Sequence, residues 1–227
     1  MEPDEGVVKF RATHATRALD ARIHGELAAR LGGWRTVLFG LGLIGQDAGR
    51  YGGVGYGNVS GRVGPFPGAR GARAFLVSGT ATGGLPCVDL EDLCLVRRYD
   101  IAGNTVLSEG PRVPSSESMT HGAVYDLAPH LRCVLHAHCP AVWRARAALG
   151  LPTTPPDVTY GTPQMARAVA RLARESRLLE RGLFAMAGHE DGVVAFGRSP
   201  DLAGAALVTA VARAAALAFE TTGRSCG

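Results

Sequence analysis

The chain has 227 residues, of which 46% are hydrophobic and 19% are charged, and its net charge is +4. These values suit one domain, residues 1–227, with a substantial core, and they exclude a disordered or coiled-coil protein. The arginines are scattered and show no basic–aromatic pattern, so nucleic acid is not an expected partner. We find no apolar run of the roughly 18–20 residues that a membrane helix needs, so no membrane association is expected.

Cysteine and lysine usage narrows the chemistry. The five cysteines show no CxxC pair, and the start of the chain does not resemble a signal peptide, so we expect a reduced, cytoplasmic protein without disulfides. Lys9 is the only lysine, and it lies in an acidic N-terminal segment, residues 1–12, that we expect to be frayed. A Schiff-base enzyme needs a lysine in its pocket. Any carbonyl chemistry is therefore expected to use a metal as the electrophile.

The predicted elements alternate along the chain. Apolar residues at helical spacing predict a helix over 18–31 that ends at Gly32-Gly33, and a glycine-rich tract follows over 52–61. Ser199 and Pro200 suit the N-cap and first turn of the last helix. The mixture, without a repeat or a linker, predicts a central sheet covered by helices. Further strands are expected over 74–77, 94–99, 105–107, 132–138, 183–187 and 193–196, and further helices over 117–127, 162–175 and 200–220.

The segment 40–45 matches the GxGxxG fingerprint of dinucleotide-binding proteins. That motif needs a helix that begins at its glycines and an acidic residue about 20 positions later. The glycines that continue to Gly57 cannot sustain a helix, and no acidic residue occurs between Asp47 and Asp89. A nicotinamide site is therefore not expected.

Two histidines with i, i+2 spacing, His136 and His138, lie in a predicted strand. Because side chains alternate in a strand, both imidazoles project to one face, where they can bind zinc or a similar ion. His189 and the carboxylate of Glu117 are further candidates. A pair of core histidines is the alternative interpretation. Cys139 is a weaker candidate ligand because its parity in the strand is opposite to that of His138.

Three polar segments suit an anion. Asn58 and Ser60 lie in the glycine-rich tract, hydroxyls and glycines alternate over 78–83, and Ser115 and Ser116 precede a predicted helix. Free N–H groups and hydroxyls at a helix N-terminus bind phosphate. Taken singly, each segment is also typical of a turn or a cap, so the anion site depends on their coming together.

The chain resembles the class II aldolase/adducin family of metal-dependent sugar-phosphate enzymes in an ordered set of motifs: Gly-Asn-Val-Ser at 57–60, Ser-Gly-Thr-Ala-Thr-Gly at 78–83, Ser-Ser-Glu at 115–117, His-x-His at 136–138 and Gly-His at 188–189. The resemblance implies a single-domain α/β/α sandwich with a mainly antiparallel sheet, and a homotetramer with sites between subunits. It also implies a divalent metal, Zn²⁺ or else Mn²⁺, Co²⁺ or Fe²⁺, on His136, His138 and His189. Glu117 would be the acid/base group. The substrate phosphate would lie on Asn58, Ser60, Thr82, Gly83, Ser115 and Ser116, with Thr80 as the alternative threonine.

The implied activity is retro-aldol cleavage of a small phosphorylated ketose or related hydroxy-carbonyl compound through a metal-stabilised enediolate. The sequence departs from the aldolase pattern, because it has no tyrosine after Tyr160. Asp157 lies where an aldolase tyrosine is expected and resembles the acid/base aspartate of sugar-phosphate 4-epimerases. Glu117 favours an aldolase and Asp157 an epimerase. Dehydratase or decarboxylase activity, and an adducin-like binding module, are the other possibilities.

Overall fold

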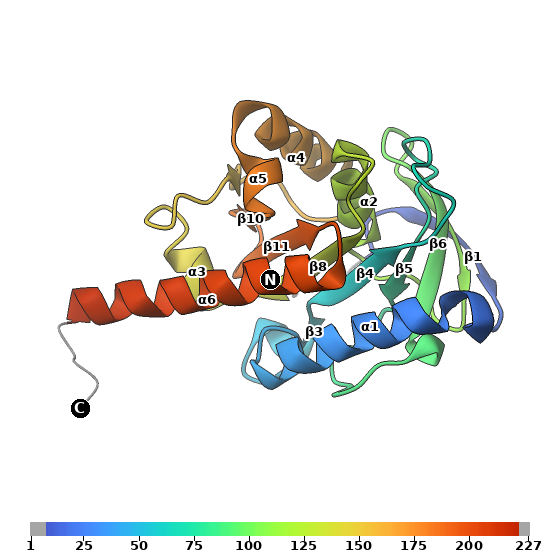
Figure 1. Ribbon diagram of the computed structural model, residues 1–227, viewed down its shortest axis with the longest axis horizontal. Helices are drawn as coiled ribbons and strands as arrows, with labels where there is room; N and C mark the ends of the chain where they lie inside the picture. Colours follow the sequence, from blue (N-terminus) through green and yellow to red (C-terminus); the bar gives the residue numbers. More distant parts are fainter. Residues whose placement is uncertain (1–7, 223–227) are drawn as a thin grey trace.

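The computed structural model describes residues 8–222, in which a nine-stranded sheet forms the centre (Figure 1). The β1–β7 and β9–β10 pairs are parallel, and the other neighbouring pairs are antiparallel. A separate hairpin pairs β2 (Gly45–Gln46) with β3 (Gly55–Tyr56). The order across the sheet is β1 (Arg11–Thr16), β7 (Thr105–Gly110), β6 (Leu93–Asp100), β5 (Phe75–Ser78), β4 (Asn58–Arg62), β8 (Cys133–His138), β11 (Gly192–Gly197), β10 (Leu183–Met186) and β9 (Thr153–Thr154).

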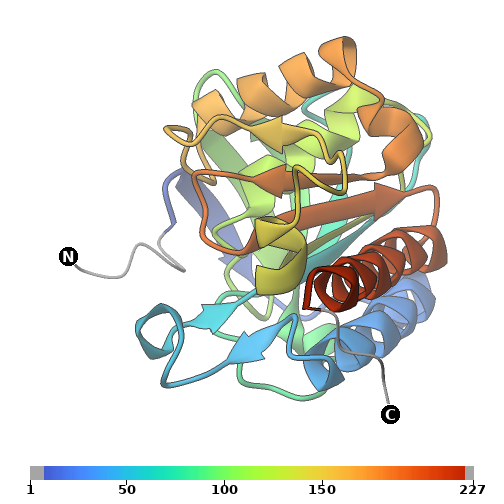
Figure 2. The ribbon, with the colours of Figure 1, turned by 90° about the vertical axis from the view of Figure 1, so that its left-hand side faces the viewer.

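Helices cover both faces of the sheet, which confirms the predicted α/β/α architecture (Figure 2). One face carries α1 (Ala21–Gly40), α3 (Pro140–Arg144) and α6 (Pro200–Thr222). The other carries α2 (Ser118–Leu127), α4 (Pro163–Glu175) and α5 (Leu178–Arg181). Two 3₁₀ turns, η1 (Tyr51–Gly53) and η2 (Leu90–Asp92), lie in the connections. That the chain is one domain stays a prediction.

The central strand β8 contributes to both cores because its side chains alternate. Leu135 and Ala137 pack in the core under α1 and α6, whereas Val134 packs in the core under α2 and α4. His136 and His138 have the parity of Val134, so their imidazoles face the α2 side of the sheet. All six residues of the strand are buried, which fixes this alternation.

The first helix is longer than the sequence predicts. It runs from Ala21 to Gly40, through the two glycines that we expected to end it. A Cβ at Gly32 would meet the carbonyl oxygen of Val88 at 2.6 Å, so this glycine permits close packing instead of terminating the helix. The buried face continues to Arg35 and Leu38, and tertiary packing therefore overrides the weak helix propensity of glycine.

Two segments that were not predicted to be strands form strands in the structure. Arg11 and Ala12, expected to be frayed, belong to β1, which pairs with β7 along its whole length; residues 1–7 and Cys226 lie outside the described part. The glycine-rich tract contains β3, which pairs with β2 in the separate hairpin, and most of β4, which pairs in the central sheet and has all five residues buried. At the last helix, the backbone N–H of Leu202 donates to the Ser199 hydroxyl at 3.2 Å, which confirms the predicted cap.

The last helix corrects the expectation about apolar runs. An 18-residue window within Pro200–Glu220 has a mean hydropathy of 1.8, so α6 is long and apolar enough by composition to cross a membrane, and 28% of that window is buried. The alanine-rich sequence produces this value with few charges. In the structure α6 packs against β11, β8, α1 and α3, as a helix does that covers a sheet.

Candidate metal and anion site

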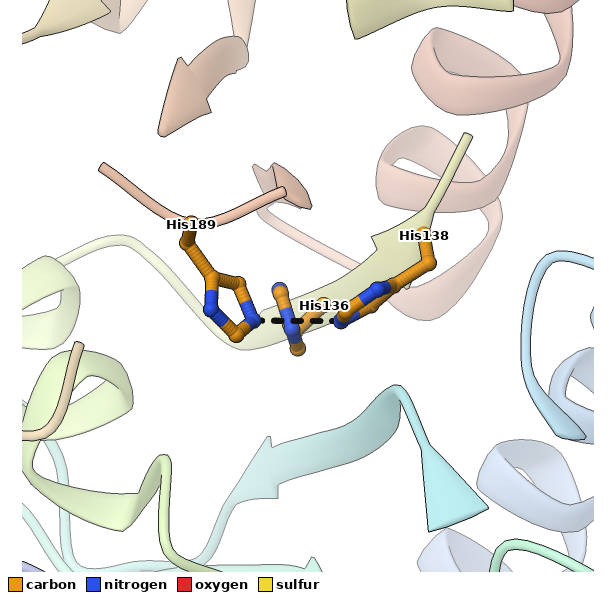
Figure 3. A group of neighbouring side chains, drawn as sticks. All are labelled: His136, His138 and His189. Atoms are coloured by element: carbon orange, nitrogen blue, oxygen red, sulfur yellow. Dashed lines mark hydrogen bonds between the residues drawn. The ribbon is translucent and has the colours of Figure 1, made fainter. Parts of the chain in front are cut away.

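Three histidines converge on the α2 side of the sheet. His136 and His138 project from β8, and His189 lies in the turn between β10 and β11 (Figure 3). Because β11 pairs with β8, Gly192 lies opposite His138 and the preceding turn carries His189 to the two strand histidines. The potential ligand atoms all lie within 4.8 Å of one another, and the Nε2 atoms of His138 and His189 are 3.1 Å apart.

The three imidazoles fit a divalent metal. The side chains of His136 and His138 are fully buried, and Nε2 of His136 has no hydrogen-bond partner in the described residues. A buried polar atom without a partner is unfavourable unless something else satisfies it. Zinc and similar ions bind neutral imidazole, and three protein ligands with an open position are typical of catalytic zinc sites. The donor set and the buried nitrogen therefore both suit such an ion.

Burial keeps these imidazoles neutral. Loss of hydration lowers the pKa of His136 to about 4, an effect partly offset by the backbone of Val193. Burial also lowers the pKa of His138 and of His189 well below 6.5, and neighbouring positive charge adds to the effect. Desolvation disfavours the charged form of a histidine. The site is therefore ready to bind a cation without first releasing protons at neutral pH.

Glu117 lies next to this triad. It is the N-cap residue of α2, its side chain is 2% exposed, and Oε1 is 3.9 Å from Nε2 of His189. His121 lies one turn along α2 from Glu117, and its backbone N–H donates to the carbonyl oxygen of Glu117. The His121 side chain is fully buried, and its Nδ1 lies 2.6 Å from the hydroxyl of Ser60. Burial, with the nearby His136, lowers the pKa of His121 to about 3. The triad and the Glu117 carboxylate thus occupy one buried region.

A pocket of about 400 Å³ gathers most of the predicted phosphate residues. Asn58 lines it directly opposite His136 in the β4–β8 register, so the pocket begins one strand away from the triad. The side-chain oxygen of Asn58 is buried and has no hydrogen-bond partner within the described chain. Other lining residues are Gln46, Thr80, Thr82, Gly83, Ser115 and Ser116. A second hollow, at the C-terminal end of β6 beside Arg70 and Tyr99, holds none of the predicted site residues.

Close backbone packing shapes this pocket. A Cβ at Gly83 would meet Cα of Gly55 at 2.5 Å and the carbonyl oxygen of Gly45 at 2.7 Å. Gly57 has φ +75°, and a Cβ there would meet Ile44 at 2.7 Å. The loop over 79–84 therefore lies directly on the β2–β3 hairpin, and only glycine allows this approach. The hydroxyl of Thr82 donates to the carbonyl of Gly79 at 2.8 Å and holds the loop turn.

Two predicted site residues lie elsewhere. Ser60 is fully buried, and its hydroxyl lies 2.7 Å from the Tyr125 hydroxyl as well as contacting His121, so it supports the interior instead of lining the pocket. Asp157 is exposed in a turn. The backbone of its neighbours packs closely on Gly188, where a Cβ would meet the carbonyl oxygen of Pro156 at 2.7 Å. Asp157 is thus exposed, in a turn that packs against the residue before His189.

A cluster around Tyr51 was missed by the sequence analysis. The Tyr51 ring packs edge-on against His138 with centroids 4.5 Å apart. Its hydroxyl donates to Asp191 Oδ2 at 2.7 Å and accepts from Nη2 of Arg50 at 2.8 Å. Burial and the Asp191 carboxylate raise the pKa of Tyr51 well above its usual value. Only the position of Asp191, two residues after His189, could have suggested this cluster.

Tyr160 packs against another member of the triad, His189, with ring centroids 4.6 Å apart. The ammonium of Lys9 lies 3.9 Å above the Tyr160 ring. Lys9 belongs to the segment that was expected to be frayed, yet its ammonium contacts a ring that packs against His189. Cys139 packs in the core on the α1 side, so strand parity separates it from the triad as predicted, and Cys133 packs in the same core.

Comparison with known proteins places this site in a family. The class II aldolase and adducin N-terminal domain family matches residues 48–218. A curated relative, the 5-methylthioribulose-1-phosphate/5-deoxyribulose-1-phosphate aldolase of Escherichia coli O45:K1 (strain S88 / ExPEC), is 32% identical over 96 residues. That match covers 34% of this chain and 45% of the relative, so it spans less than half of the relative's length.

Solved structures share the fold. The L-fuculose-1-phosphate aldolase of Thermus thermophilus has a TM-score of 0.63 at 22% identity, with 89% of this chain and 98% of the other covered. YgbL of Klebsiella pneumoniae, described as a putative aldolase/epimerase/decarboxylase, has a TM-score of 0.60 at 20% identity, covering 89% and 92% of the two chains. These likenesses agree with the predicted fold, and the family match supports an enzyme of aldolase type. The match extends over most of the chain, and the protein belongs to the class II aldolase and adducin family.

Proposed function

We propose that the protein is a metal-dependent lyase that cleaves a small phosphorylated ketose, or a related hydroxy-carbonyl compound, by a retro-aldol reaction. The observation that carries this proposal is the buried triad of His136, His138 and His189 with Glu117 beside it, next to a pocket rich in hydroxyls. The relative that is named as an aldolase for ribulose-1-phosphate derivatives supports the substrate class.

The roles of the residues follow from their positions. The three histidines hold a divalent metal, with Zn²⁺ the first candidate and Mn²⁺, Co²⁺ or Fe²⁺ the others. A bound metal supplies Lewis-acid stabilisation of the negative charge that develops on the substrate's carbonyl oxygen during cleavage. Asn58, Thr82, Gly83, Ser115 and Ser116 bind the phosphate, with Thr80 as a further hydroxyl. Ser60 keeps a supporting role through His121.

The proton transfers of the proposed reaction define the role of Glu117. In a retro-aldol reaction the hydroxyl beyond the breaking carbon–carbon bond gives up its proton to solvent, and its oxygen forms the aldehyde C=O. The electron pair of the broken bond passes to the carbon beside the carbonyl. That carbon is then protonated. Glu117 is buried 3.9 Å from His189, so we assign it the proton transfer at this carbon. Exclusion of water from the buried carboxylate protects the intermediate from unwanted protonation.

Assembly and location are part of the proposal. A soluble, cytoplasmic homotetramer with sites between subunits would place another copy of the chain against the site. Asp157 is exposed, its two sequence neighbours pack on Gly188 just before His189, and its carboxylate could then reach the substrate in a neighbouring subunit. This position is the specific observation that favours the second candidate, a sugar-phosphate 4-epimerase. A dehydratase or decarboxylase would use the same metal site.

A turnover screen tests the proposal. The metal-loaded protein is incubated with ketose 1-phosphates, and dihydroxyacetone phosphate and the released aldehyde are measured. We expect cleavage by the wild type, and we expect Glu117→Gln to keep the metal and lose turnover. Asp126→Asn, which changes a largely buried carboxylate remote from the triad, is the matched control. A Glu117→Gln protein that cleaves at the wild-type rate would contradict the assignment, and a wild type without metal would favour an adducin-like binding role.

A further inference from the structure

The proposed phosphate pocket has no charged side chain in its lining. Among the described residues that line it, the polar groups are amides, hydroxyls and backbone N–H groups. A phosphate monoester carries a charge between about −1.5 and −2 at neutral pH. Neutral donors and the N-terminus of α2 can bind such a group, but a fixed positive charge nearby would bind it more strongly.

Arg35 carries such a charge, and it lies behind the residues 82–83 that line the pocket. The side chain extends from α1 and is 1% exposed, so its guanidinium is fully enclosed. Nη2 donates to the carbonyl oxygen of Thr82 at 2.7 Å and to that of Gly83 at 3.0 Å. Nη1 is buried and has no hydrogen-bond partner, and no carboxylate in the described residues forms an ion pair with Arg35.

A buried guanidinium without a counter-ion is unfavourable. Burial lowers the pKa of Arg35, and Asp92 and Cys87 oppose that effect only from a distance. Arginine stays protonated in proteins even when it is buried. The free-energy cost of burying this cation must therefore be offset by another interaction. An anion bound in the adjacent pocket would supply it.

The contacts of Arg35 also orient the pocket backbone. In a trans peptide the C=O and N–H groups point in opposite directions. Since the carbonyls of Thr82 and Gly83 point to Arg35, the N–H groups of Gly83 and Gly84 point away from it. Neither N–H donates a hydrogen bond within residues 8–222. Thr82 and Gly83 line the pocket, so two unused donors lie on the pocket side of the loop.

We propose that Arg35 is a positioning residue that makes the pocket selective for a phosphate monoester, by turning the N–H groups of the 82–84 loop outward and by supplying the positive charge behind them. This inference rests on the proposed function only for the location of the substrate's phosphate. It predicts a preference for a doubly charged phosphate over a singly charged carboxylate, because the interaction with the buried charge grows with the charge of the ligand.

Inorganic phosphate is the probe, and its dissociation constant is measured by calorimetry on metal-loaded protein. Three variants separate charge from hydrogen bonding: Arg35→Lys keeps the charge, Arg35→Gln keeps donors without charge, and Arg35→Met removes both. Arg62→Met is the matched control, because Arg62 is 3% exposed, has two nitrogens without partners, and donates to Pro67 away from the pocket.

We expect phosphate to bind roughly tenfold more weakly, or worse, to Arg35→Met, while Arg62→Met binds like the wild type. Arg35→Lys should bind more tightly than Arg35→Gln. A purely structural role would make those two variants equal, and that result, or a wild-type affinity in Arg35→Met, would overturn the inference. If Arg35→Met does not fold, the phosphate affinities of Arg35→Lys and Arg35→Gln decide the question.

Turnover gives an independent reading. With a cleaved ketose phosphate, Arg35→Gln should raise KM by about the same factor as the phosphate dissociation constant, with kcat and metal content nearly unchanged. If the wild type cleaves the substrate and Arg35→Gln has the same KM as the wild type, this inference alone would be overturned. A wild type that binds phosphate in an Arg35-dependent way and cleaves nothing would overturn the proposed function alone.

Discussion

The hydroxyl of Tyr51 lies 2.7 Å from Oδ2 of Asp191, and both residues have the left-handed backbone conformation that favours glycine. Their φ angles are +49° and +59°. Such a conformation costs about 1–3 kcal/mol in a non-glycine residue and persists where the surroundings enforce it. Here the bond ties η1 to the turn that carries His189, while the Tyr51 ring packs against His138. Two strained residues thus hold two of the three potential metal ligands.

Replacing Tyr51 by phenylalanine should therefore weaken metal binding. The ring remains, but Asp191 loses a partner, and the loop is no longer fixed to the turn of His189. We expect a loss of about 1–2 kcal/mol in the free energy of unfolding, and a zinc dissociation constant that is raised roughly tenfold. Competition with a chelating dye measures the zinc affinity.

The matched control is Tyr99→Phe. The Tyr99 hydroxyl donates to Asp126 at 2.9 Å, on the far side of α2 from the triad. This variant should lose similar stability and keep the zinc affinity of the wild type. Equal zinc affinities in the two variants would show that the Tyr51–Asp191 bond has no influence on the triad.

The buried histidines predict how the stability of the metal-free protein depends on pH. His121 and His136 have pKa values of about 3 and about 4, whereas the unfolded histidines titrate near 6.5. Below pH 6.5 the unfolded chain takes up protons that the folded chain excludes. The free energy of unfolding should therefore fall with decreasing pH, by about 1.4 kcal/mol per pH unit for each such histidine.

Burial also lowers the pKa of His138 and His189, so up to four protons contribute between pH 6.5 and about 4. Urea unfolding at pH 7.5, 6.5, 5.5 and 5.0 measures this slope above the range of most carboxylates. His136→Gln should reduce the slope by about one proton. A free energy that does not change between pH 7.5 and 5.0 would contradict the burial of neutral imidazoles.

Glycine at position 83 should be essential for the pocket. In Gly83→Ala the new Cβ meets backbone atoms of Gly55 and Gly45, which cannot move as a flexible side chain can. We expect a loss of about 1–3 kcal/mol in stability, together with weaker phosphate binding. Gly33→Ala is the control, since nothing lies within 4 Å of its Cβ in α1, and it should stabilise the protein by up to about 1 kcal/mol. Thermal unfolding of both variants decides, and a stable Gly83→Ala would show that the loop does not rest on the hairpin.

Asp157→Asn separates the two candidate reactions. If the protein is an aldolase, the rate of cleavage should fall by less than about tenfold, because Glu117 carries the proton transfer. An epimerase would lose the roughly 10²–10⁴-fold that a general acid or base contributes. Product analysis by NMR distinguishes cleavage from inversion at one carbon. Inversion by the wild type that is abolished in Asp157→Asn would establish the epimerase.

The sequence predicts those parts of the site that depend on local periodicity. The i, i+2 spacing of His136 and His138 specifies one face of a strand, and Ser115 and Ser116 precede a helix as their hydroxyls suggest. The late His189 follows from the family motif. The strand parity of the two histidines and the position of the two serines before a helix can both be read from neighbouring residues.

Other features depend on contacts between distant segments. The sequence predicts that the first helix ends at Gly32, but close packing of Gly32 against Val88 keeps this residue in the middle of α1. Residue 11 and its neighbours pair with β7, about ninety positions away, so nothing local marks them as a strand. Arg35 and Tyr51 reach the site only because α1 and η1 fold back onto the loops that carry Thr82 and Asp191.

Elemental analysis of the purified protein beside His136→Ala tests the central claim most directly, with His24→Ala as the control for a buried histidine outside the triad. We predict about one zinc or similar ion per chain in the wild type and in His24→Ala, the stoichiometry of a single three-histidine site. We predict none in His136→Ala. A wild type that holds no metal even after reconstitution, or a His136→Ala protein that retains it fully, would contradict the assignment of the triad as a metal centre.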